Sequence, residues 1–318
     1  MSSCGGNKNK ITIAEVTHSV FYAPQYVAIE LGYFEEEGLD VSLVLAAGAD
    51  KTMAALLSKD AQIGLMGPEA SVFVYNGGQK NYAINFAQLT QCDGSFLVSR
   101  ENIPNWSWDM LQGAEILGGR KGGMPEMTLE YVLKSKGYEV GQDDPTKDVY
   151  VRTDVQFAAM GGAFSSGEGD YVTMFEPAAL ALEKQGVGYV VASVGEASFG
   201  IPFTAYSATK EYMEKNPEQI QKFTNAIYKA QKWVEKASAK DIAKTIHPHF
   251  PETSLEDLEI VMQRYVDINA WKTDPTFPEA GLNKLMEVME LANELDKRAP
   301  YDKIVTNKFA NEAIKNVK

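Results

Sequence analysis

Segments of strand and helix character alternate along the first part of this chain, and this alternation constrains the fold more than any other feature. Apolar or alternating runs of strand length cover residues 11–16, 39–46, 61–66, 82–89 and 95–98. Segments typical of helices lie between them, at residues 24–31, 51–58 and 69–75. A β-α-β-α order predicts a mostly parallel sheet with helices on both of its faces.

A second series of the same kind follows. Its predicted strands are residues 114–117, 148–151, 171–175 and 188–194, and its predicted helices are residues 125–136, 154–164 and 177–185. Two such series predict an α/β protein with two similar lobes. From residue 217 the pattern turns almost wholly helical, because Ile220, Phe223 and Ile227 recur at helical spacing. We therefore expect a helical C-terminal region.

Composition limits the partners that the protein can have. The chain has 318 residues, of which 45% are hydrophobic and 23% charged, so it can bury the core of two lobes. Its net charge of −13 argues against nucleic acid and anionic membrane surfaces as partners. We expect a monomer that binds a small molecule and no nucleic acid.

The two cysteines, Cys4 and Cys92, have different expected roles. Cys92 is most simply a small buried residue. Cys4 lies in a polar tail, residues 1–10, that resembles the mature end of a bacterial lipoprotein, whose first residue is a lipidated cysteine. The resemblance implies a tether, a lipid anchor on Cys4 and an extracytoplasmic location, although the apolar signal segment that should precede the cysteine is missing from this sequence.

A glycine-rich turn, Gly118-Gly119-Arg120-Lys121-Gly122-Gly123-Met124-Pro125, joins the predicted strand 114–117 to the predicted helix 125–136. Such a turn offers backbone N–H groups and the positive end of a helix dipole to an anionic or polar group. Lys121, Gly122, Gly123 and Met124 are therefore candidate contacts for an oxyanion, formyl or phosphate group. An ordinary strand-to-helix turn explains the same residues. The sequence has neither the Gly-Lys-Ser/Thr of a Walker loop nor a dinucleotide fingerprint here.

Several segments together resemble one family of ABC-transporter solute-binding proteins, those for nitrate, alkanesulfonates, taurine and the pyrimidine precursor of thiamine. The segments that carry the resemblance are residues 20–28, 31–41, 60–64, 175–178 and 208–218. Within the family, Gly122-Gly123-Met124-Pro125-Glu126-Met127-Thr128-Leu129-Glu130-Tyr131 is most similar to the thiamine-pyrimidine branch.

The resemblance implies a class II periplasmic-binding-protein fold, in which crossing strands join two α/β lobes. Lobe 1 would comprise residues 11–93 plus 200–318, and lobe 2 residues 94–199. The solute would bind in the cleft between the lobes, at the carboxyl ends of the strands. The implied partners are the solute and the subunits of an ABC permease, and no cofactor or metal is expected.

Aromatic residues that follow predicted strands are the first group of candidate ligand contacts. Phe21 and Tyr22 follow the first strand, where they would stack on a flat heterocycle or simply pack the cleft rim. Phe157, Phe175 and Tyr206 are weaker candidates for the opposite wall.

Carboxylates form the second group. Glu69 and Glu176 follow strands, but each also lies near a helix start, where a carboxylate is favoured without any function. Facing a ligand, they would accept hydrogen bonds from an aminopyrimidine and repel a sulfonate or nitrate. Asp154 is a third candidate carboxylate. Gln88 and Thr90 are candidate ligand contacts with uncharged polar side chains.

Catalysis is not expected. His18 is the one histidine near the proposed cleft, either as a ligand contact or as a hydrogen-bonded structural residue. His247 and His249 lack the partners of a metal site, and no nucleophile–base pair is evident. The leading hypothesis is therefore a receptor that delivers a thiamine-related pyrimidine to a permease. The alternatives are a receptor for an alkanesulfonate or nitrate, a sensor domain, and an enzyme resembling the fungal pyrimidine synthases, whose cysteine-rich iron motif this chain lacks.

Overall fold

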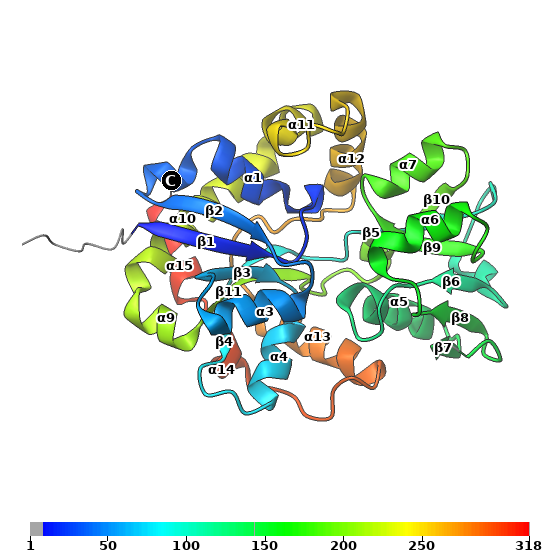
Figure 1. Ribbon diagram of the computed structural model, residues 1–318, viewed down its shortest axis with the longest axis horizontal. Coiled ribbons are helices and arrows are strands. Elements are labelled where there is room, and N and C mark those ends of the chain that lie inside the picture. Colours follow the sequence, from blue (N-terminus) through cyan, green and yellow to red (C-terminus); the bar gives the residue numbers. More distant parts are fainter. Residues whose placement is uncertain (1–8, 143, 318) are drawn as a thin grey trace, which may run out of the picture.

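Two α/β lobes lie side by side in the computed structural model, which describes residues 9–142 and 144–317 (Figure 1). The first lobe contains a five-stranded sheet in the order β2-β1-β3-β11-β4. Its strands are β1 (Lys10–Glu15), β2 (Asp40–Leu45), β3 (Ile63–Met66), β4 (Ala83–Thr90) and β11 (Thr204–Thr209). β1 pairs in parallel with β2 and β3, whereas β11 is antiparallel to both β3 and β4.

The second lobe contains a six-stranded sheet in the order β10-β5-β9-β6-β8-β7. Its strands are β5 (Ser95–Ser99), β6 (Glu115–Leu117), β7 (Val140–Gln142), β8 (Val149–Arg152), β9 (Tyr171–Phe175) and β10 (Tyr189–Ser193). β6 is parallel to β8 and β9, and β7 to β8. β5 is antiparallel to its neighbours β9 and β10.

Both sheets are thus mostly parallel, as expected, and each contains one strand that runs in the opposite direction, β11 in the first and β5 in the second. β5 and β11 are the strands that the chain enters immediately after it passes from one lobe to the other. They begin at the boundary between the lobes, whereas the parallel strands end there, so they must run in the opposite direction. This topology brings the carboxyl ends of both sets of parallel strands to the same boundary (Figure 1).

Helices cover both sheets. Those between the strands are α1 (Ala23–Glu30), α2 (Tyr33–Glu36), α3 (Ala49–Ser58) and α4 (Glu69–Asn76) in the first lobe, and α5 (Met124–Ser135), α6 (Met160–Ser165), α7 (Ala178–Lys184) and α8 (Val194–Ala197) in the second. The predicted helix 154–164 is only partly formed: a 3₁₀ turn, Phe157–Ala159, precedes the short α6. Gly161 and Gly162 lower the helix propensity of this segment.

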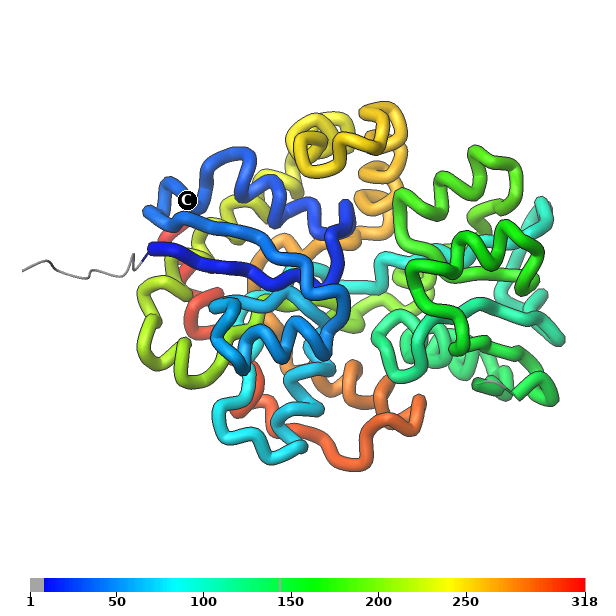
Figure 2. Tube along the Cα trace, in the orientation of Figure 1, coloured from blue at the N-terminus to red at the C-terminus, as the bar shows by residue number. Residues whose placement is uncertain are grey.

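The C-terminal region is helical, as predicted, and returns to the first lobe (Figure 2). It comprises α9 (Lys210–Lys215), α10 (Pro217–Lys236), α11 (Ala239–Ile246), α12 (Leu255–Asp267), α13 (Glu279–Leu291), α14 (Tyr301–Ile304) and α15 (Lys308–Asn316). The apolar stripe of α10, including Ile220, Phe223 and Ile227, is buried. α12 and α13 extend to the second lobe, where α13 packs against α5. No helix in the described part of the chain has the length and apolar character to span a bilayer.

The core continues across the boundary between the lobes. One cluster of buried apolar side chains includes Phe21 and Val27 of the first lobe together with Met124, Met160 and Val172 of the second. Cys92 is buried beside this boundary and has a free thiol. The apolar residues at the boundary therefore belong to the interior of the protein.

Gly195 of α8 is in close contact with the segment that crosses from β4 of the first lobe to β5 of the second. A Cβ atom at this position would lie 1.9 Å from the carbonyl oxygen of Asp93, which precedes β5. We expect Gly195→Ala to lower the free energy of unfolding by about 1–3 kcal/mol, because the backbone of this crossing segment must move to make room. Urea unfolding followed by circular dichroism measures the change.

Gly162→Ala is the matched control for this prediction. Gly162 lies in α6, and a Cβ atom there would meet no heavy atom within 4 Å. Alanine is favoured over glycine inside a helix by about 1 kcal/mol, so this variant is expected to unfold at the same or higher urea concentration. Equal stability of the two variants would show that α8 is not tightly packed against the crossing segment.

Candidate functional site

The ends of the parallel strands place four loops at the boundary between the lobes. From the first lobe come the loop after β1, with Phe21, and the loop after β3, with Glu69. From the second lobe come the glycine-rich turn after β6 and the segment after β9, with Glu176. Open α/β sheets bind ligands at such strand ends. We therefore take this boundary as the candidate site.

An aromatic cluster fills the centre of the boundary. The ring of Phe21 is 1% exposed and its centroid lies 5.7 Å from that of Phe175, 6.0 Å from Phe203 and 5.1 Å from Tyr265. Phe157 lies 5.8 Å from Phe175 and is 44% exposed. Phe21 belongs to the first lobe, and Phe175 and Phe157 belong to the second, so both lobes contribute rings to the cluster. Its exposed part is on the second lobe, at Phe157 and the half-buried Phe175, where a flat ring could stack.

Glu69 is a buried carboxylate with unmet hydrogen-bonding capacity in the loop after β3, and Asp93 and Glu130 also each have one oxygen without a hydrogen-bond partner among the described residues. Glu69 begins α4, is 5% exposed, and its Oε2 atom has no hydrogen-bond partner among the described residues. Burial raises the pKa of Glu69 to about 7, and this rise is opposed by its own backbone N–H, by the charge of Arg120 in the second lobe and by the Ala70 N–H. The charge of Glu69 also helps to raise the pKa of Tyr22, mainly a burial effect, so the two groups are close. A buried, unpartnered acceptor of this kind is a candidate ligand contact.

Glu176 is occupied by contacts within the protein. Its Oε1 atom forms an ion pair with Arg264 of α12, and its Oε2 atom accepts a hydrogen bond of 2.9 Å from the Leu180 N–H. Burial raises the pKa of Glu176, and the charge of Arg264 opposes this rise. Arg264 also pairs with Glu183. The observed role of Glu176 is thus to join the second lobe to the first.

The glycine-rich turn leads from β6 directly into α5, as predicted, but two of its N–H groups already donate hydrogen bonds within the turn and α5. Gly122 has φ +71° and donates to Glu126 Oε2 at 3.0 Å, and Gly123 donates to the Arg120 carbonyl at 3.1 Å. Lys121 is exposed, and Met124 is 4% exposed. Sequence reasoning did not select Arg120, whose guanidinium lies 3.6 Å from Asp50 across the boundary. Only the folded chain brings these two residues together.

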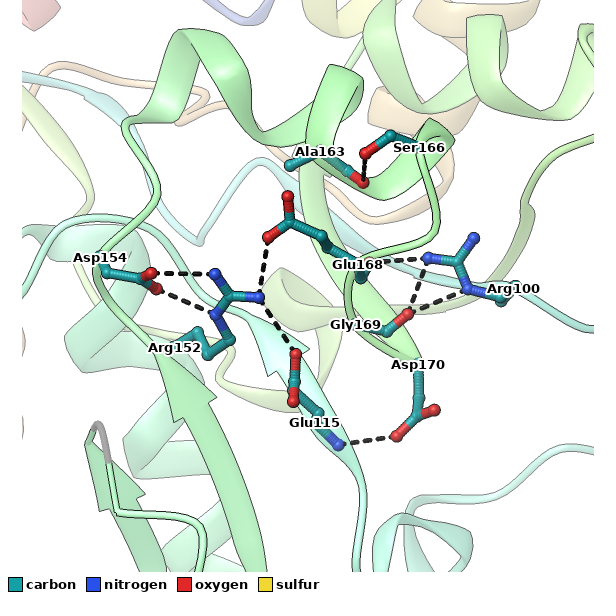
Figure 3. Close-up of polar contacts among 9 residues, drawn as sticks. All are labelled: Arg100, Glu115, Arg152, Asp154, Ala163, Ser166, Glu168, Gly169 and Asp170. Carbon is teal, nitrogen blue, oxygen red and sulfur yellow. Dashed lines mark hydrogen bonds and ion pairs between the residues drawn. The ribbon is translucent and has the colours of Figure 1, made fainter.

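Asp154 belongs to an ion-pair network of the second lobe (Figure 3). Arg152 donates to both of its oxygens, at 3.0 and 2.8 Å, and these bonds lower the pKa of Asp154. The same guanidinium contacts Glu115 at 3.2 Å and Glu168 at 2.9 Å. Arg100 donates to the backbone carbonyl groups of Glu168 and Gly169 nearby. The structure thus places Asp154 in this network, apart from the aromatic cluster.

Three further candidates make contacts inside the first lobe. Thr90 Oγ1 lies 2.5 Å from Thr204 Oγ1, which joins β4 to β11. Gln88 donates to the Thr90 carbonyl at 3.0 Å, while its Oε1 atom has no partner within the described structure. The hydroxyl of the fully buried Tyr206 donates to Gln25 at 3.1 Å. These contacts stabilise the sheet and its junction with α1.

His18 is also held by the protein, with Glu15 and the carbonyl of His249 on its two ring nitrogens. It lines a cavity of about 640 Å³ together with Glu15, Ile29, Leu43 and His249. A second cavity, of about 290 Å³, lies against Arg100, Asp170 and Tyr171 of the second lobe. Neither cavity includes a residue of the aromatic cluster, so we locate the site by strand ends and side-chain chemistry. In the described residues, no three His, Cys, Asp or Glu side chains are arranged to hold a metal ion.

Comparisons with known proteins agree with this architecture. A model of the NMT1-like family matches residues 5–247. A protein of Bacillus subtilis (strain 168), named "Putative binding protein YtlA", is 46% identical over 303 residues, which cover 95% of this chain and 89% of that protein.

Two solved structures share the fold over nearly their whole length. One is a zinc-bound ligand-binding component of an ABC-type import system from Staphylococcus aureus, with TM-score 0.74, 15% identity and coverage of 96% of this chain and 99% of that chain. The other is the periplasmic nitrate-binding protein NrtA from Synechocystis PCC 6803, with TM-score 0.73, 16% identity and coverage of 98% and 89%. At such identities the likeness concerns the fold, and it confirms the predicted periplasmic-binding-protein fold.

Proposed function

Because this chain belongs to the NMT1-like family and has the periplasmic-binding-protein fold, we propose that it is the extracytoplasmic solute-binding component of an ABC importer. It captures a small solute between its lobes and delivers it, chemically unchanged, to the permease. The names of its relatives support this role, since one is a binding protein and another a ligand-binding component of an import system. Cys4, the proposed lipid anchor, lies outside the described residues.

The proposed solute is a thiamine-related pyrimidine or a similar small aromatic heterocycle. The observation that carries this proposal is the buried Oε2 atom of Glu69, which has no hydrogen-bond partner in the described part of the chain, at a boundary that also holds an aromatic cluster built from both lobes. An ionised carboxylate accepts hydrogen bonds and donates none, so it suits the N–H groups of an aminopyrimidine. Ring stacking on Phe157 or Phe175 would contribute about 0.5–1.5 kcal/mol beyond the burial of the ring.

An anion of the alkanesulfonate or nitrate type is the second candidate. The fold shared with a nitrate-binding protein and the position of Arg120 near Glu69 favour it. Two observations argue against an anion. Glu69 is buried at the boundary and would repel an anion when ionised, and the Gly122 and Gly123 N–H groups already have acceptors within the turn.

A sensor domain that binds the same solute is a further alternative. A permease gene beside the gene of this protein would indicate transport, and a kinase gene would indicate signalling.

The enzyme alternative requires a histidine that reacts, and the geometry of His18 does not favour it. Its Nδ1 atom lies 2.8 Å from Glu15 and its Nε2 atom 2.9 Å from the His249 carbonyl, so neither nitrogen faces the aromatic cluster. We propose a non-catalytic, monomeric receptor. Mass spectrometry of the His18 peptide after incubation with pyridoxal phosphate and iron tests this point, and modification of the imidazole would contradict it.

Titration calorimetry tests the proposed solute directly. The probes are a hydroxymethyl aminopyrimidine, thiamine, ethanesulfonate and nitrate, each titrated into the purified full chain. We expect tight binding of the aminopyrimidine and none of the two anions. Tight anion binding without aminopyrimidine binding would remove the heterocycle and leave the importer role. A native mass spectrum of the purified protein provides an independent check, because a retained solute shows its own mass.

A further inference from the structure

His18 lies between two hydrogen-bond acceptors. Its Nδ1 atom is 2.8 Å from the Glu15 carboxylate, and its Nε2 atom is 2.9 Å from the carbonyl oxygen of His249. An ionised carboxylate and a carbonyl both accept hydrogen bonds, so beside them each ring nitrogen donates one. Only the imidazolium form carries both protons. The geometry therefore assigns a positive charge to His18.

The contacts of Glu15 fix the direction of this network. Glu15 is 2% exposed, and its Oε2 atom accepts hydrogen bonds from Gln25 Nε2 at 2.9 Å and from the Tyr26 hydroxyl at 3.0 Å. Gln25 in turn accepts from Tyr206 at 3.1 Å. The Tyr26 hydroxyl also lies 3.1 Å from His18 Nδ1, but its single proton is donated to Glu15, so it does not donate to His18. His18 is thus the cation that balances a buried carboxylate.

The same histidine joins two segments that are far apart in the sequence. Its ring stacks on Phe250, with centroids 4.7 Å apart and an interplanar angle of 27°. Phe250 follows the 3₁₀ turn His247–His249, which connects α11 to α12. On the other side, His18 lies in the loop that leads to Phe21, whose carbonyl accepts a hydrogen bond of 2.7 Å from Trp271. The loop is therefore held at His18 and again at Phe21.

We propose that His18 is a positioning residue for solute binding: held as an imidazolium between Glu15 and the His249 carbonyl, it fixes the loop that presents Phe21 and Tyr22 at the boundary between the lobes. This proposal rests on the proposed solute site, because its effect on affinity acts through those two aromatic residues. It assigns to His18 no contact with the solute.

The charged groups around His18 make its hold on the loop depend on pH. The hydrogen bond to Glu15 raises the pKa of His18 above its ordinary value of 6.5, the charge of Glu252 adds to the rise, and partial burial opposes it. Burial lowers the pKa of His249, which lies 2.9 Å from Glu30 without hydrogen-bond alignment. A raised histidine pKa means that the stabilisation is complete below pH 6.5 and is lost as the pH rises through the raised value.

The charge of His18 is measured by NMR on the ligand-free protein. The chain has three histidines, so His247→Gln and His249→Gln suffice to assign the imidazole resonances. We expect His18 to titrate above its ordinary range and Glu15→Gln to lower its pKa. A His18 pKa at or below the ordinary value would overturn the proposal, whatever the protein binds.

Positioning is measured by amide hydrogen exchange and by affinity for the hydroxymethyl aminopyrimidine. We expect His18→Gln to reduce protection of residues 17–22 at pH 6 and to weaken binding about tenfold, with a ratio near one at pH 9. His247→Gln, on the same 3₁₀ turn, is the control and should match the wild type. Since the titration of the probe itself cancels in the ratio of variant to wild type, the pH dependence belongs to His18.

The two readouts separate this proposal from the proposed function. Reduced protection of residues 17–22 in His18→Gln without any aminopyrimidine binding would support the positioning of the loop and contradict the proposed solute. Unchanged protection, together with an affinity ratio that does not vary with pH, would overturn the role of His18 and leave the solute site intact.

Discussion

Arg264→Met is expected to lower the free energy of unfolding by about 3–5 kcal/mol, the cost of removing one partner from a buried ion pair. Arg264 extends from α12 of the first lobe to Glu176 of the second, whose side chain is 0% exposed. Methionine fills much of the arginine volume but leaves the Glu176 carboxylate buried without its cation. Urea unfolding at pH 8 measures the loss.

The pH dependence of this loss identifies its cause. Burial already raises the pKa of Glu176 above 4.5, and the variant removes the opposing charge of Arg264, so the pKa rises further. A raised carboxyl pKa penalises the folded state at high pH, and protonation relieves the penalty as the pH falls through that value. We therefore expect the difference between variant and wild type to shrink at acidic pH.

Arg298→Met is the matched control for Arg264→Met. Arg298 donates to both oxygens of one carboxylate, that of Glu290, at 2.7 Å each, and both side chains are about two-fifths exposed. Exposed pairs of this kind contribute about 0–1 kcal/mol. If Arg264→Met were no more destabilising than this control, the ion pair between the lobes would contribute no more to the free energy of unfolding than an exposed pair does.

Most of the fold follows from local patterns in the sequence. Pro24 and Gly32 mark the ends of α1, and Gly32 has the positive φ of +72° that a helix terminator requires. The direction of β5 and β11 does not follow, because it depends on where the chain passes between lobes. β7 is missing from the predicted strands because Val140-Gly141-Gln142 has a single apolar side chain, whereas the equally short β6 contains the apolar pair Ile116-Leu117.

The candidate site was only partly accessible to sequence reasoning. Their position after a strand makes Glu69 and Glu176 equal candidates in the sequence. Their environments differ because Arg264 pairs with Glu176, and this partner lies 88 residues away in the chain, so local patterns do not indicate it. Asp154 was selected by the same rule, and the neighbouring Arg152 engages it instead. Strand ends indicate which side chains reach the boundary, while the partner that each finds there depends on distant residues.

Glu69→Gln is expected to weaken binding of the hydroxymethyl aminopyrimidine about 10- to 100-fold, as for loss of a charged hydrogen bond of about 1.5–3 kcal/mol. An amide keeps the shape of the carboxylate but loses its charge and presents N–H donors. For an anionic solute the sign reverses, because removal of a buried negative charge would strengthen binding. Titration calorimetry with the aminopyrimidine and with ethanesulfonate therefore distinguishes the two classes of solute in one variant.

Proton release gives the second signature of Glu69. Because its pKa is about 7 without ligand, a solute that needs the ionised carboxylate must displace a proton at pH 6, so affinity falls below pH 7 and the binding enthalpy depends on the buffer. Glu69→Gln should abolish this release. Glu126→Gln should retain it, since Glu126 also has a pKa of about 7 but is hydrogen-bonded to Gly122 and Gln142. Equal proton release in all three proteins would exclude Glu69 from the site.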